Sequence, residues 1–214
     1  MHTHGNAAEA LLENNVEHHL RPVRKMLSDE EKIASIKEHF GAIMETLGLD
    51  LTDDSLRDTP QRVAKMFVRE VFSGLDERNS PRITTFENNY GYSEMLVEKD
   101  ITLHSFCEHH FLPIIGKVHV AYFPGKKVVG LSKLNRLVGY YAKRPQVQER
   151  LTMQIANGLK EALGTEDVAV YIEADHLCVA ARGVEDTKSS TVTSFYGGRF
   201  RRVEERQAFL GSLK

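Results

Sequence analysis

The sequence has only two cysteines among its 214 residues, Cys107 and Cys178. Two cysteines are too few for the disulfide framework of a small secreted domain, and each lies within three residues of a histidine. Residues 1–20 lack the apolar core and small-residue cleavage site of a signal peptide. These features favour a reducing, cytoplasmic environment over an oxidising one.

The chain also lacks an excess of charge and a long apolar run. Its formal net charge is −2, so no general basic field is present to attract nucleic acid or an anionic membrane. No apolar run approaches the length that spans a bilayer. Hydrophobic residues make up 41% and charged residues 27% of the chain, which is typical of a soluble globular protein with one domain and an extension.

The first 80 residues read as a polar arm followed by helices. Residues 1–26 are polar, with a short helix possible over 7–13. Ser28 and Glu31 form a capping box, apolar residues follow at helical spacing, and Gly48 suits the position after the helix end. A second helix starts at Thr59 as N-cap with Pro60 behind it, and runs to about residue 72.

The remainder, residues 81–214, alternates between strand and helix patterns. We predict strands at residues 82–87, 94–104, 117–123, 168–174, 178–183 and 191–196. Helices are predicted at residues 131–142, 147–163 and 203–210, the last ended by Gly211. This order indicates an α+β domain with an antiparallel sheet and a helix pair on one face, preceded by the N-terminal helical region over 27–80.

The two cysteines lie in segments that suit a metal. Cys107 and His110 form a Cys-x-x-His pair, and Cys178 adds a third donor. Three protein ligands with an open position are typical of catalytic zinc. If the strand before His176 continues, His176 and Cys178 share one face. His109 and His176 would then lie beside the metal, free to move protons. Alternatively, one of them is a fourth ligand that closes the metal site. A further alternative is that each cysteine is only a small buried hydrophobe.

Six stretches of the chain match the motifs of one known family. They are SFCEHHF (105–111), GLSKLNR (130–136), RPQVQERLT (144–152), HLCVAARG (176–183), TPQRVAKM (59–66) and FSGL (72–75). Together they resemble GTP cyclohydrolase I, over roughly residues 27–213. The resemblance implies a tunnelling fold (T-fold) over residues 81–214. It also implies a homodecamer of two stacked pentamers, with active sites at protomer interfaces. The implied reaction converts GTP and water to 7,8-dihydroneopterin triphosphate and formate, the first step of folate or pterin biosynthesis.

The resemblance also implies roles for individual residues. Zinc would be held by Cys107, His110 and Cys178, with His109 and His176 as proton carriers. The guanine would be bound through Glu149 and Gln148, since a carboxylate can accept both N1–H and N2–H₂. The triphosphate would be bound by cations and by the N-terminus of a helix. The residues concerned are Ser132, Lys133, Arg136 and Arg182, together with Arg62 and Lys65, which a neighbouring protomer would contribute.

The same residues allow two other interpretations. One is a non-catalytic module whose zinc has four protein ligands and holds two segments together. The other is a different purine- or pterin-handling T-fold enzyme, such as a reductase with a cysteine nucleophile. That second reading requires a metal-free thiol and a nicotinamide site, and the sequence contains no dinucleotide-binding signature.

Overall fold

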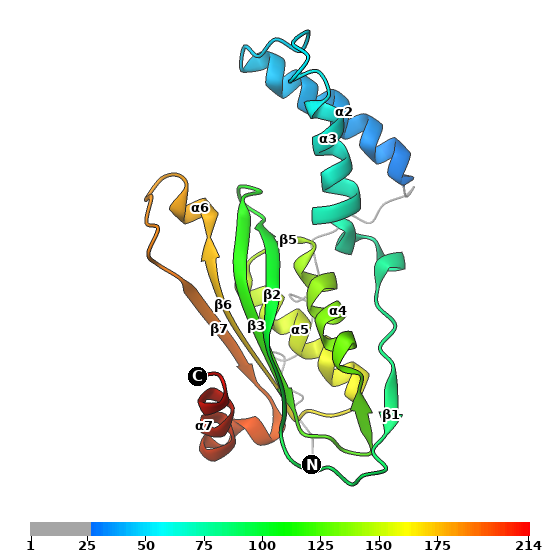
Figure 1. Ribbon diagram of the computed structural model, residues 1–214, viewed down its shortest axis with the longest axis vertical. Coiled ribbons are helices and arrows are strands. Elements are labelled where there is room, and N and C mark those ends of the chain that lie inside the picture. Colours follow the sequence, from blue (N-terminus) through cyan, green and yellow to red (C-terminus); the bar gives the residue numbers. More distant parts are fainter. Residues whose placement is uncertain (1–26) are drawn as a thin grey trace, which may run out of the picture.

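The computed structural model describes residues 27–214. They form a body built around a five-stranded sheet, with a pair of helices that projects from one end (Figure 1). The arm expected over residues 1–26, including its short helix, lies outside the described residues. In the described part of the chain, no helix combines the length and the apolarity that a membrane crossing requires.

The first projecting helix, α2 (Asp29–Thr46), has the boundaries that its caps predict. The Glu31 N–H donates to the Ser28 hydroxyl at 3.2 Å, and the Ser28 N–H donates to the Glu31 carboxylate at 2.7 Å. This reciprocal pair satisfies two of the free donors at the helix start. At the other end, Gly48 has a φ of 82°, the left-handed conformation expected of a glycine behind a helix.

The second projecting helix, α3 (Thr59–Met66), starts one residue earlier than predicted. Asp58 is the N-cap, so the prediction of Thr59 as N-cap was wrong, and Pro60 is the second helical residue. A proline is tolerated there because the first helical N–H groups have no partner within the helix. The chain continues as a π-helix, η1 (Phe67–Val71), and two 3₁₀ turns, η2 (Ser73–Leu75) and η3 (Glu77–Asn79).

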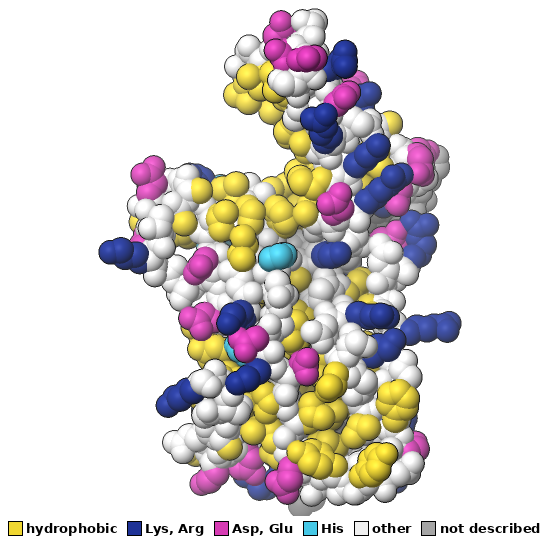
Figure 2. All heavy atoms as spheres, viewed as in Figure 1, with side chains coloured by type: hydrophobic (Ala, Val, Ile, Leu, Met, Phe, Trp, Pro, Cys, Tyr) yellow, Lys and Arg dark blue, Asp and Glu magenta, His cyan; other side chains and the backbone are white. Residues whose placement is uncertain are grey.

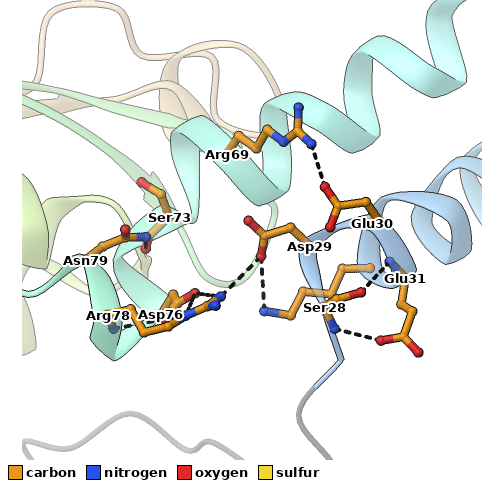
Figure 3. A network of polar contacts seen from close by, with 10 residues as sticks. Ser28, Asp29, Glu30, Glu31, Arg69, Ser73, Asp76, Arg78 and Asn79 are labelled. Carbon is orange, nitrogen blue, oxygen red and sulfur yellow. Dashed lines mark hydrogen bonds and ion pairs between the residues drawn. The ribbon is translucent and has the colours of Figure 1, made fainter.

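Ion pairs link the start of α2 to these turns (Figure 3). Arg78 donates from two nitrogens to Asp76 and lies 3.6 Å from Asp29, the first residue of α2. Arg69 lies 3.1 Å from Glu30. The hydrogen bonds from Arg78 lower the pKa of Asp76 to about 2, so this carboxylate stays ionised well into the acidic range. The network therefore ties the projecting pair to the segment that leads into the body.

The sheet of the body has the strand order β5-β2-β3-β6-β7. Its four long strands are antiparallel, as predicted: β2 (Leu96–Cys107), β3 (Pro113–Tyr122), β6 (Val168–His176) and β7 (Thr191–Tyr196). The short β5 (Pro145–Gln146) runs parallel to β2, so the sheet is mixed at that edge. A separate two-stranded sheet joins β1 (Thr85–Glu87) to β4 (Lys127–Val129).

Two helices cover one face of the sheet, α4 (Leu131–Ala142) and α5 (Gln148–Leu163), which confirms the predicted pair (Figure 1). Their buried apolar side chains, among them Leu134, Leu151 and Ile155, pack against the inward side chains of the central strands in one core. The terminal helix α7 (Val203–Ser212) packs Phe209 against Phe200 in a second, smaller cluster. Because Leu151 and Ile155 belong to the core shared with the sheet, the N-terminal half of α5 is fixed against the sheet.

Two further details of the sequence prediction were wrong. Residues 178–183 are not a strand, because β6 ends at His176 and a one-turn helix, α6 (Leu177–Ala180), follows it. Gly211 does not end the terminal helix, which continues through it to Ser212. In both places the local pattern was short, and the tertiary contacts around the chain decided its conformation.

The pairing of β3 with β6 is unusually close at one point. Gly116 of β3 lies opposite Ala174 of β6. A β-carbon on Gly116 would lie 2.1 Å from the Glu173 carbonyl oxygen and 2.5 Å from the Ala174 Cα. A side chain therefore cannot fit at this position unless the two central strands separate.

We predict that Gly116→Ala lowers the free energy of unfolding by about 1–3 kcal/mol, the usual range for overpacking a core. The matched control is Gly139→Ala inside α4, where an added β-carbon meets nothing within 4 Å. That change should instead raise stability by about 0.5–1 kcal/mol, since alanine favours a helix interior over glycine. Denaturant unfolding at one fixed protein concentration measures both. A Gly116→Ala protein as stable as the parent would show that the strands separate without cost.

Candidate metal centre

The structure brings together the three residues that the sequence selects as metal ligands. Cys107 ends β2, His110 lies in the connection to β3, and Cys178 lies in α6 directly after β6. The register of β3 with β6 sets Ile114 opposite His176, so both segments meet at the same end of the sheet. The ligand atoms of Cys107, His110 and Cys178 all lie within 4.8 Å of one another.

The connection between β2 and β3 is a tight loop. The Cys107 N–H donates to the Leu112 carbonyl at 2.8 Å, and the Phe111 N–H donates to the Cys107 carbonyl at 2.9 Å. Phe111 has a φ of 54°, an uncommon conformation for an aromatic residue. Its ring packs against those of Phe72 and Phe67, with centroids 5.0 and 6.1 Å away. These aromatic contacts connect the loop to the segment below the projecting helices.

The donor set fits a zinc ion. A tetrahedral zinc with Zn–S near 2.3 Å and Zn–N near 2.0 Å sets its donors about 3.5–3.8 Å apart, which requires only a small contraction from the observed spacing. Burial and the neighbouring Cys107 thiol raise the pKa of the Cys178 thiol. Two thiolates at this distance are therefore unfavourable unless a cation lies between them. A divalent metal bound between them would supply that cation.

His176 is oriented by a buried glutamine. The Gln148 Nε2 lies within 3.3 Å of three acceptors, the carbonyls of Ile172 and Thr191 and the hydroxyl of Thr193. This fixes the amide so that its Oε1 faces His176 Nε2 at 2.8 Å. An amide oxygen only accepts, so His176 Nε2 carries the hydrogen and Nδ1 keeps its lone pair. The prediction that Gln148 binds substrate is untested, but its side chain is engaged within the protein and buried.

The pKa of His176 is lowered by burial, and the carboxylates of Glu149 and Asp175 oppose that shift. Glu149 is thus within electrostatic range of His176. It is exposed in the first turn of α5. The second histidine, His109, lies with its Nδ1 3.7 Å from the Cys107 sulfur. In the described part of the chain, the metal-ligating group has only the three members named above.

The predicted phosphate-binding residues fall into three places. The Arg182 Nη1 lies 3.0 Å from His110 Nε2, directly beside the candidate metal centre. Ser132, Lys133 and Arg136 lie in the first turns of α4, behind its N-cap Gly130, and basic side chains gather on that side of the molecule (Figure 2). Arg62 and Lys65 lie on α3, in the projecting pair, and are exposed. No recorded contact within residues 27–214 joins this last pair to the metal-ligating group.

Sequence reasoning missed the residues that support this site. Glu108, inside the Cys-x-x-His stretch, forms an ion pair with Arg150 of α5. Thr193 of β7 fixes the amide of Gln148 together with two backbone carbonyls. Glu108 and Arg150 were both visible in the sequence as charged residues. Their pairing was not, because 42 residues separate Glu108 from Arg150.

Comparison with known proteins shows extensive similarity. A family model described as GTP cyclohydrolase I matches residues 36–214. The chain is 58% identical over 201 residues to the GTP cyclohydrolase 1 of Flavobacterium johnsoniae, covering 94% of this chain and 90% of that protein. It is 54% identical to that of Aeromonas salmonicida, over 90% of this chain and 88% of the relative. For Histophilus somni the identity is 51%, over 96% and 94%.

We predict that Cys178→Ser abolishes zinc binding and leaves the protein folded, because the hydroxyl is a far weaker zinc donor than the thiolate and Cys178 packs only at the edge of the core. Zinc content after dialysis and circular dichroism measure the two properties. Val179→Ser, one residue further along α6, introduces the same side chain without removing a ligand and should keep full zinc. A Cys178→Ser protein that retains one zinc per chain would remove Cys178 from the ligand set. Unfolding on metal loss would indicate a structural metal instead.

Proposed function

We propose that this chain, which belongs to the GTP cyclohydrolase I family, converts GTP and water to 7,8-dihydroneopterin triphosphate and formate. This reaction is the first step of folate or pterin biosynthesis. The observation that carries the proposal is the three-membered Cys107, His110 and Cys178 group, with two further histidines and Glu149 beside it. Three ligands leave one position open, which is what a hydrolytic metal site needs.

We assign zinc to Cys107, His110 and Cys178. When bound, zinc supplies the Lewis acidity that makes water a usable nucleophile near neutral pH. The chain's own residues supply the proton transfers. His176, with its Nε2–H held by Gln148, presents Nδ1 as the atom that accepts or returns a proton. His109, beside the Cys107 sulfur, is the second carrier and serves the other proton transfer during ring opening and sugar rearrangement.

The substrate contacts follow from charge and hydrogen-bond pattern. The Glu149 carboxylate is exposed at the start of α5 and accepts from the N1–H and N2–H₂ of guanine. Gln148 contributes to the guanine site by orienting His176, as its side-chain amide is fully engaged inside the protein. The triphosphate is bound by Arg182 and by the first turns of α4. Lys133 and Arg136, three residues apart, share one helix face there.

We further propose a T-fold assembly, a homodecamer of two pentamers in the cytoplasm, with Arg62 and Lys65 reaching the site of a neighbouring protomer. Their place on the projecting α3, away from the metal-ligating group among the described residues 27–214, supports a role in another chain. A cavity of about 840 Å³ between α2 and the segment that follows α3 supports it too. Its lining is largely apolar, and Ile43 there is 52% exposed, which suits packing by a second copy.

The experiment that tests the function measures formate release from GTP together with zinc content. The proposed enzyme releases one formate per GTP, and a chelator stops the reaction. A closed structural zinc site predicts bound metal without formate, and a cysteine-dependent reductase predicts neither zinc nor formate. Either result would reject the proposal.

We predict that Glu149→Gln weakens GTP binding strongly at unchanged zinc content. Glutamine keeps the shape but presents a donor to the donors of guanine, and mispaired polar sites discriminate by about 10⁴–10⁵. Equilibrium binding of GTP and ATP to both proteins measures this. Glu161→Gln, an exposed glutamate on the same helix, is the matched control and should bind GTP normally. If Glu149→Gln binds GTP as tightly as the parent and still rejects ATP, guanine is recognised elsewhere.

We predict that Arg136→Ala weakens GTP binding by roughly 10- to 150-fold, as expected for a charge-assisted contact worth about 1.5–3 kcal/mol. Guanosine, which lacks phosphates, should bind to the variant and the parent equally. Calorimetric titration with both ligands measures the difference, and Arg201→Ala near the C-terminus is the control. An equal loss for guanosine would show that Arg136 does not bind phosphate.

A further inference from the structure

The segment that carries two of the three metal-ligating residues is joined to α5 by a partly buried ion pair. The Glu108 carboxylate accepts a hydrogen bond from Arg150 Nη2. The Arg150 side chain is only 8% exposed and that of Glu108 is 28% exposed. Removing Glu108 is expected to be costly, because the charge of Arg150 would stay buried without its carboxylate partner.

Arg150 is itself fixed by polar neighbours. Its Nε donates to Gln146 Oε1 at 3.2 Å, and its Nη2 also donates to the Pro145 carbonyl at 3.2 Å. The Gln146 amide in turn donates to the Tyr141 carbonyl and to Gln154 Oε1, both at 2.8 Å. The guanidinium is therefore held in one orientation, with little freedom to follow Glu108 if the loop moves.

Glu108 connects three parts of the site. Its backbone N–H donates to the Gln146 carbonyl at 3.0 Å, where β2 meets β5. One carboxylate oxygen bonds Arg150, and the other, Oε1, lies 3.9 Å from His109 Nε2. Arg150 directly follows Glu149 in the first turn of α5. This one ion pair therefore links the loop that carries the proton carrier His109 and the ligand His110 to the start of α5, where guanine would bind.

We propose that Glu108, held by Arg150, is a positioning residue that fixes the loop bearing Cys107, His109 and His110 relative to the guanine-binding start of α5. The reacting carbon of a bound guanine must sit at a set distance from the metal-ligating group, and the two are anchored on different elements. The ion pair sets that distance. This inference rests on the proposed function, and failure of that function would appear as absence of formate release from the parent protein itself.

The test compares Glu108→Gln with the parent, at saturating zinc and per bound metal. We expect kcat for formate release to fall by about 10- to 100-fold, the usual cost of altering a residue that orients metal ligands. The KM for GTP should stay within about threefold, because Glu149 and the phosphate-binding cations are unchanged. In cobalt(II)-substituted protein without GTP, the visible absorption bands should shift, as they report the geometry of the ligands.

Glu166→Gln is the matched control. This change removes the ion pair between Glu166 and Lys160. Lys160 also belongs to α5 but lies near the end opposite to Arg150. Glu166→Gln should therefore leave kcat, KM and the cobalt spectrum as in the parent. Glu108→Asp retains the charge on a shorter side chain and should recover part of the lost kcat. If Glu108→Gln fails to fold, the kcat, the KM and the cobalt spectrum of Glu108→Asp test the proposal instead.

The proposal is overturned if kcat per bound metal and the cobalt spectrum are unchanged while the thermal midpoint falls, since the pair would then only stabilise the fold. A rise in KM with unchanged kcat would overturn it as well, because Glu108 would then act in binding GTP.

Discussion

The site depends on the register of two antiparallel strands. Ile114 of β3 lies opposite His176 of β6, and this pairing brings the loop before β3 to the segment after β6. Because side chains alternate along a strand, a slip of one residue would turn every side chain of β6 to the opposite face. The close backbone approach at Gly116 shows how tightly the two strands are joined at this end. The convergence of two cysteines and a histidine is thus a consequence of backbone pairing.

The start of α5 is polar where a helix against a sheet is usually apolar. Gln148, Arg150, Thr152 and Gln154 of α5 are all buried, as is Gln146 of the preceding β5. Each buried polar group needs a hydrogen-bond partner to offset its lost hydration. These side chains hydrogen-bond to one another, to the backbone of β6 and β7, and to the loop after β2. Such a network is costly when incomplete and specific when complete. Its placement next to the metal-ligating group indicates that precision of the site, more than stability, accounts for it.

The projecting helices serve the site through their base. The ion pairs of Figure 3 fix the start of α2 against the turns over residues 73–79. Phe67 and Phe72, which directly precede these turns, pack against Phe111 of the loop between β2 and β3. Loop position and helix position are therefore mechanically connected.

The sequence by itself determined the elements with strong local signals and the chemistry of the ligands. Ser28 and Gly48 delimit α2, and Gly164, with a φ of 64°, ends α5 where its type predicts, because caps act over three or four residues. Cys107, His110 and Cys178 were identifiable as donors because few other residue types bind zinc. That α6 replaces the expected strand at residues 178–183 was not readable, since a stretch this short takes its conformation from its surroundings.

Only the tertiary structure decided how distant residues meet. The pairs Glu108 with Arg150 and Gln148 with His176 are separated by 42 and 28 residues, and no local periodicity records such contacts. Whether a charge is buried, and whether an amide orients a histidine, depends on atoms brought together by strand register and helix packing. The residue types set which chemistry is possible, and the fold fixes which atoms perform it, because hydrogen bonds and ion pairs act over a few ångströms of space regardless of distance along the chain.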